Sequence, residues 1–70
     1  MYELTRYVSY IEKNNIYAVY CNFNLYFFKG DTYKWFKDFL EFKNIENINK
    51  EFIKYLLDKE IIKKSGELDA

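Results

Sequence analysis

The chain has 70 residues, of which half are hydrophobic and 23% are aromatic, and its eleven basic and eleven acidic side chains leave no net charge. This length allows one domain. The high apolar content excludes an intrinsically disordered chain, and the neutral total disfavours a nucleic-acid-binding protein, which usually carries a basic surplus.

Three short segments in the first half of the chain have the pattern of β-strands. Apolar and polar side chains alternate over residues 7–12 and 16–22, and the intervening Asn14 and Asn15 suit a tight turn because asparagine tolerates positive φ. Residues 25–28 are the third predicted strand, and all four are apolar. A strand that is apolar on both faces predicts cover on one face and a partner or another element on the other.

Two helices are predicted next, over residues 32–42 and 50–59. Asp31 and Asn49 are candidate N-caps, because their side chains can accept hydrogen bonds from the first backbone N–H groups of a helix. The spacing of apolar residues places one stripe of each helix in the core. The core residues predicted from these stripes are Phe36, Phe39, Phe52 and Leu56.

The order of these patterns predicts an α+β, winged-helix-like fold, in which a three-stranded antiparallel sheet is followed by two main helices. The apolar pair Ile61 and Ile62 is expected to form a short wing. Residues 43–48 leave room for little more than a turn between the helices. We expect a single domain over residues 1–64 and a flexible tail over residues 65–70, which has little apolar content.

Most of the residues that carry enzyme chemistry are missing from the sequence. It has no histidine, two glycines and a single cysteine, Cys21. This excludes a histidine general base and a glycine-rich phosphate loop, and it disfavours a zinc site. We therefore expect a protein that is not an enzyme and that uses no metal or cofactor. The unpaired thiol, the lack of a signal-peptide pattern and the lack of a long apolar run predict a cytoplasmic location away from membranes.

Three stretches resemble the PqqD-like domains known as RiPP precursor peptide recognition elements. They are residues 24–31 (NLYFFKGD), 32–40 (TYKWFKDFL) and 51–62 (EFIKYLLDKEII), and the last looks like the final helix of the family with its apolar pair. The resemblance covers roughly residues 7–64. The chain departs from the family in its middle helix, which is short or absent here.

The resemblance implies a standalone adaptor in natural product biosynthesis. Such a domain binds the leader segment of a ribosomally made precursor peptide by strand addition and presents it to a peptide-modifying enzyme. By position, the third strand and the last helix would supply the contacts. The implied peptide-binding residues are Leu25, Tyr26, Phe27, Phe28, Glu51, Tyr55 and Lys59.

Two other functions stay open. A small winged-helix nucleic-acid-binding protein would use the second helix for recognition, with support from Arg6, Lys63 and Lys64, but acidic neighbours weigh against it. A phage or mobile-element inhibitor would dock on a larger protein. Because an apolar open strand invites aggregation, we expect either a monomer whose edge receives a peptide or an edge-paired homodimer.

Overall fold

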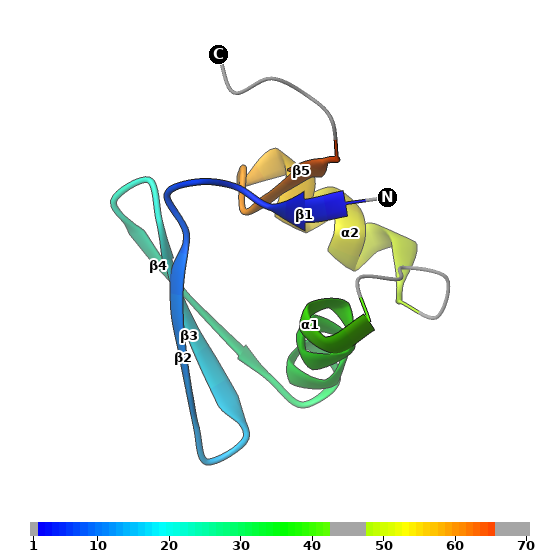
Figure 1. The fold of residues 1–70 in the computed structure, drawn as a ribbon. Helices are drawn as coiled ribbons and strands as arrows, with labels where there is room; N and C mark the ends of the chain where they lie inside the picture. The colour runs from blue at the N-terminus through cyan, green and yellow to red at the C-terminus, as the bar shows by residue number, and fades with distance from the viewer. Residues whose placement is uncertain (1, 43–47, 66–70) are drawn as a thin grey trace.

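The alternating segments form a three-stranded antiparallel sheet in the computed structural model, which describes residues 2–42 and 48–65 (Figure 1). The strands are β2 (Ser9–Lys13), β3 (Ile16–Cys21) and β4 (Asn24–Lys29), with β3 in the middle. The sequence predicted all three strands and their antiparallel order, with bounds shifted by one or two residues.

Two-residue turns join these strands and set their register. Asn14 and Asn15 have φ of 54° and 60°, and Asn22 and Phe23 have φ of 51° and 65°. Positive φ at both central residues defines the turn type whose twist matches a β-hairpin. The turn predicted at Asn14 and Asn15 is confirmed. Phe23 is the unusual member, because a bulky side chain disfavours this backbone region.

A second, two-stranded sheet pairs β1 (Tyr2–Leu4) with β5 (Ile62–Lys64). Thr5 strengthens this junction: its backbone N–H donates to the carbonyl of Ile61 at 3.0 Å and its hydroxyl donates to the carbonyl of Glu60 at 2.7 Å. The pairing ties the first described residues to the chain that leaves the last helix. The sequence predicted that the apolar pair Ile61 and Ile62 follows the last helix, but it did not predict that β1 pairs with this segment.

Helix α1 (Asp31–Phe42) follows β4 after a single linking residue, Gly30, whose φ is 63°. The helix starts one residue earlier than predicted, so Asp31 belongs to its first turn instead of capping it. A carboxylate in the first turn still interacts favourably with the helix dipole. Because only one residue separates strand from helix, the first turns of α1 lie beside the end of β4.

Helix α2 (Lys50–Asp58) begins as the sequence predicted. The side-chain oxygen of Asn49 accepts hydrogen bonds from the N–H groups of Glu51 at 2.8 Å and Phe52 at 3.2 Å, so Asn49 is the N-cap. The helix ends one residue before the predicted bound, and Lys59 is its C-cap.

The core lies between one face of the three-stranded sheet and the two helices. The four predicted core residues are all buried, which confirms the apolar stripes of both helices. The helices and the β1-β5 sheet lie on the same side of the three-stranded sheet, and no element of the described residues covers its other face (Figure 1). The buried residues are Tyr17, Val19, Cys21, Phe28, Phe36, Phe39, Ile48, Phe52, Ile53, Leu56, Ile61 and Ile62.

Two predicted segments lie largely outside the described residues. The connection predicted at residues 43–48 is described only at Ile48, which is buried, and the tail predicted at residues 65–70 only at Ser65. Neither of the described helices is long and apolar enough to cross a lipid bilayer.

Candidate functional site

The outer side of β4 is an open strand edge. β4 pairs with β3 on one side, and no other strand of the described residues pairs with it. The two-residue turn makes Cys21 and Asn24 a hydrogen-bonded pair, so the ladder alternation points the backbone groups of Tyr26 and Phe28 toward β3. Leu25 and Phe27 therefore direct their N–H and C=O groups to the open edge.

The end of this edge is closed by a side chain of α1. The Thr32 hydroxyl donates a hydrogen bond to the carbonyl of Lys29 at 2.8 Å. This contact satisfies the last outward carbonyl of β4 and fixes the first turn of α1 against the strand end. The stretch of edge that an added strand would use is thus centred on Leu25 and Phe27.

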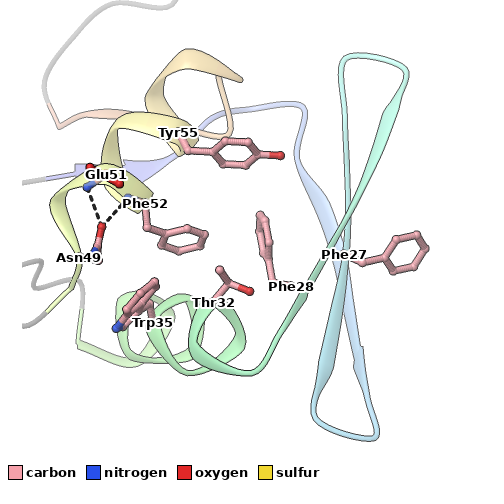
Figure 2. A pocket seen from close by; sticks show the side chains of 8 residues that line it. All are labelled: Phe27, Phe28, Thr32, Trp35, Asn49, Glu51, Phe52 and Tyr55. Carbon is pink, nitrogen blue, oxygen red and sulfur yellow. Dashed lines mark hydrogen bonds between the residues drawn. The ribbon is translucent and has the colours of Figure 1, made fainter.

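A groove of about 420 Å³ lies beside the open edge, between β4, α1 and α2 (Figure 2). Side chains from the three elements converge on it: Phe28 from β4, Trp35 from α1, and Phe52 and Tyr55 from α2. Most of these side chains are apolar, and rings from separate elements form the walls. The lining residues are Phe27, Phe28, Thr32, Trp35, Asn49, Glu51, Phe52 and Tyr55.

Aromatic contacts hold the floor of the groove. Phe28 meets Phe52 edge to face, with ring centroids 5.2 Å apart and an interplanar angle of 83°. Trp35 lies 5.6 Å from Phe52 on the other side. Edge-to-face and tilted ring pairs stabilise the fold by more than their buried area alone would, and they restrict the side chains to one arrangement. The floor is therefore formed before any ligand arrives.

Tyr55 forms the exposed wall of the groove. Its ring stacks at 6.5 Å on Phe52, with an interplanar angle of 9°, and it meets Tyr26 edge to face at 6.1 Å. Burial, together with the neighbouring Tyr26, raises the pKa of the Tyr55 hydroxyl, which stays a neutral hydrogen-bond donor at physiological pH. The Lys59 ammonium sits 5.8 Å from the centre of the Tyr55 ring, within the range of a cation–π interaction.

The structure separates the residues that the family resemblance implied. Phe27, Phe28, Glu51 and Tyr55 line the groove, Tyr26 supports Tyr55, and the Lys59 ammonium lies over the Tyr55 ring. Alternation along β4 places Leu25 and Phe27 on the opposite face of the sheet, and Figure 2 shows the Phe27 ring pointing away from the groove. Those two residues offer backbone groups at the edge.

Four lining residues were absent from the expected site, namely Thr32, Trp35, Asn49 and Phe52. Two of them carried a different signal in the sequence, because Asn49 was predicted as a cap and Phe52 as core. The short link at Gly30 was the signal for Thr32 and Trp35. A helix that starts one residue after a strand must place its first turns beside the strand end.

Two further polar groups with raised pKa values, the Tyr33 hydroxyl and the Cys21 thiol, are not among the residues that line the groove. The Tyr33 hydroxyl donates to the carboxylate of Glu12, and this hydrogen bond is the main reason why the pKa of Tyr33 rises to about 12. Burial raises the pKa of the Cys21 thiol, and the Cys21 Sγ–H group lies 3.6 Å from the carbonyl of Glu60. A buried thiol with a raised pKa is typical of a structural cysteine.

The exposed side of α2 carries charges of both signs. Lys50, Lys54 and Lys59 are exposed there, and Glu51 and Asp58 lie between them. Neither a continuous cationic stripe nor a continuous acidic stripe runs along the described helix. This mixed pattern gives the helix no strong preference for a phosphate backbone.

Comparison with models of known families, with curated proteins and with solved structures finds no match for this chain. No relative therefore supplies a ligand for the groove. The open edge of β4 and the aromatic groove beside it are the features from which a function can be inferred.

Proposed function

We propose that the protein is a non-catalytic peptide-binding module, in which an extended peptide adds as a fourth strand to the open edge of β4. The observation that carries the proposal is the position of that edge. The outward backbone groups of Leu25 and Phe27, with which no other strand of the described residues pairs, lie directly beside an apolar groove. Strand addition takes affinity from backbone pairing and specificity from pockets for alternate side chains, and this site offers both.

The shape of the groove sets the class of peptide. In an added strand every second side chain points to the face where the helices lie, so one or two of them enter the groove. The rings of Phe28, Phe52 and Tyr55 favour a large aliphatic or aromatic side chain there. The exposed carboxylate of Glu51 on the rim favours a basic residue next to it.

The biological role that we propose follows the family resemblance of the sequence. The peptide is the leader segment of a ribosomally made precursor, and the module holds it for a peptide-modifying enzyme in the cytoplasm. An adaptor of this kind needs an exposed edge and no catalytic group of its own. Binding of the leader would also cover an edge that otherwise invites aggregation.

Amide hydrogen exchange of the full chain tests strand addition directly. A displayed library of unstructured peptides is selected on the wild-type protein, and exchange is measured with and without the strongest selected peptide. We expect new protection at the N–H groups of Leu25 and Phe27. The N–H groups of Tyr26 and Phe28 already pair with β3 and serve as internal controls.

The pattern of protection decides between binding modes. Alternate protection on β4, with chemical-shift changes on the α2 residues that line the groove, supports strand addition. A selected peptide that binds tightly but leaves Leu25 and Phe27 unprotected contradicts it. A library that yields no binder at all contradicts the peptide-binding function.

A further inference from the structure

The face of the three-stranded sheet that looks away from the helices carries exposed apolar side chains from all three strands. We call it the outer face. Cross-strand register puts Ile11 of β2, Ala18 of β3 and Phe27 of β4 in one row across its centre. Tyr20 and Leu25 form a second row with Ser9, and no acidic side chain of the described strands points to this face. The residues of the outer face are Ser9, Ile11, Lys13, Ile16, Ala18, Tyr20, Leu25, Phe27 and Lys29.

Most of the exposed hydrophobic side chains of the described residues gather on this face or at its end. Ile11, Tyr20, Leu25 and Phe27 are between 48% and 66% exposed. Phe23 in the β3-β4 turn is 93% exposed, and Tyr7 is exposed beside it. A hollow of about 620 Å³ lies at this end, and it is lined by Arg6, Tyr7, Ser9, Tyr20, Asn22 and Phe23.

The backbone of Phe23 is strained, and its side chain gains almost no compensating burial within the chain. Its φ of 65° lies in the left-handed region, where a side chain with a Cβ is disfavoured by roughly 1–2 kcal/mol. The ring is almost wholly exposed, so it gains no burial within the chain. Backbone strain of this kind, at an exposed aromatic residue, points to a contact outside the chain.

We propose that the occupant of the outer face is a second copy of this chain, packed face to face. At roughly 200 Å² for each fully exposed large side chain, the exposed fractions of the six residues Tyr7, Ile11, Tyr20, Phe23, Leu25 and Phe27 correspond to about 800 Å². A standard protein–protein interface buries about 800 Å² on each partner. The outer face therefore has the area that a stable dimer needs.

The charges of the outer face select one relative orientation of the two copies. Lys13 and Lys29 flank Ile16 in the row at one end, and Tyr20 and Phe23 lie toward the other end. A twofold axis along the strands would place the lysines of both copies against each other. A twofold axis across the strands places each lysine pair over the aromatic end of its partner, where cation–π contacts form.

The dimer and the peptide site use different surfaces. The groove and the outer face lie on opposite sides of the sheet, and face-to-face packing leaves the edge of β4 unpaired. This arrangement differs from a homodimer that pairs edge to edge, which would block the peptide. Each of the two proposals can therefore fail without the other.

Sedimentation equilibrium of the full chain tests the dimer. We expect the wild type to dimerise within the micromolar range, which is reached by interfaces of this size. Ile11→Lys puts a charge at the centre of the outer face, and that face offers no carboxylate to pair with it. Its dissociation constant should rise by about tenfold or more. Asp58→Asn is the matched control, because it changes the net charge equally on exposed α2 and should dimerise like the wild type.

Lys29→Glu tests the orientation. It should weaken the dimer if Lys29 lies over aromatic rings, and it should strengthen the dimer if Lys29 faces the partner's lysines, which would overturn the proposed axis. Ile11 is largely exposed, so Ile11→Lys should keep the wild-type circular dichroism spectrum. Its thermal midpoint should equal that of the wild type at a dilution where both proteins are monomeric, because association itself raises the midpoint.

Two outcomes overturn the dimer itself. One is a wild type that stays monomeric throughout the micromolar range, and the other is an Ile11→Lys variant that dimerises as tightly as Asp58→Asn. If the wild type is monomeric and also sediments with vesicles of phosphatidylcholine and phosphatidylserine, the outer face is assigned to a lipid surface instead.

Discussion

Tyr26 of β4 and Tyr55 of α2 meet edge to face, with ring centroids 6.1 Å apart and an interplanar angle of 87°. This contact joins the edge strand to the last helix. Because it holds the ring of Tyr55 over the open side of the groove, the width of the groove depends on two rings from elements that are far apart in the sequence.

Tyr55→Ala should weaken peptide binding by about tenfold or more, because it removes the exposed wall of the groove. The fold should survive, since Tyr55 is 38% exposed. Calorimetric titration with a peptide selected on the wild type measures the change. Tyr55→Phe keeps the ring and should bind nearly as well as the wild type. Equal affinity of the Ala variant and the wild type would remove the groove from the binding site.

Proline scanning of β4 should separate the two sets of backbone groups. Phe27→Pro removes an N–H that faces the open edge, so the domain should fold and lose the peptide. Tyr26→Pro removes an N–H that faces β3, so it should destabilise the sheet itself. Circular dichroism and peptide titration report on the two effects. Phe27→Ala controls for the lost ring and should retain binding; the reverse pattern for the two prolines would mean that the edge is assigned to the wrong residues.

A matched pair of leucines should measure how much the core contributes. Leu56 is fully buried, and Leu56→Ala should lower the free energy of unfolding by about 2–5 kcal/mol. Leu25 is largely exposed on the outer face, and Leu25→Ala in the monomer should cost less than about 1 kcal/mol. Urea unfolding at high dilution compares the two. A core of this size gives about 3–5 kcal/mol in total, so Leu56→Ala should populate the unfolded state without denaturant.

The sequence was sufficient for the elements whose local signals agree. Asn14 and Asn15 have the residue type that the hairpin turn requires, and the alternation on both sides fixes the strands. Asn49 is followed by a regular apolar stripe, so the start and the buried face of α2 were both predictable. In these cases short-range chemistry and tertiary packing favour the same structure.

The sequence was insufficient where pairing is distant or the pattern is uniform. Strand β1 has three residues and no period of its own, and it becomes a strand only by pairing with β5. In β4 all of Leu25, Tyr26, Phe27 and Phe28 are apolar, so alternation cannot tell which two face the core. The register with β3, whose Tyr17, Val19 and Cys21 are buried, decides this. The groove depends on that choice, which is why only part of the site was predicted.

The hydrogen bond from Tyr33 to Glu12 should make stability fall at high pH. The pKa of Tyr33 is about 12 in the folded protein and 10 in its ordinary state, so folding favours the protonated hydroxyl. The stabilisation is complete below pH 10 and is lost as the pH rises toward 12. Absorbance titration should show one tyrosine that ionises at a higher pH than the others, and Glu12→Gln should lower the pH of that ionisation. Tyr33→Phe should lose less stability than the wild type between pH 10 and 12.

Phe23→Gly should stabilise the monomer, although it deletes a large aromatic ring. Glycine adopts φ of 65° without a steric penalty, and asparagine followed by glycine is the preferred pair for this turn. The ring is 93% exposed, so its loss removes almost no buried surface. We expect the free energy of unfolding to rise by about 1 kcal/mol, measured by urea unfolding at a dilution where the wild type is monomeric.

Phe23→Ala is the matched control for this gain. It removes the same ring but keeps the Cβ, so the backbone strain remains and the stability should stay close to that of the wild type. A gain in the Gly variant alone identifies the backbone as its source. At higher concentration the Gly variant should also dimerise more weakly, because Phe23 supplies part of the outer face. A Gly variant that is less stable than both the wild type and Phe23→Ala would show that the ring supports the fold of its own chain, and Phe23 would then no longer count as evidence for a partner.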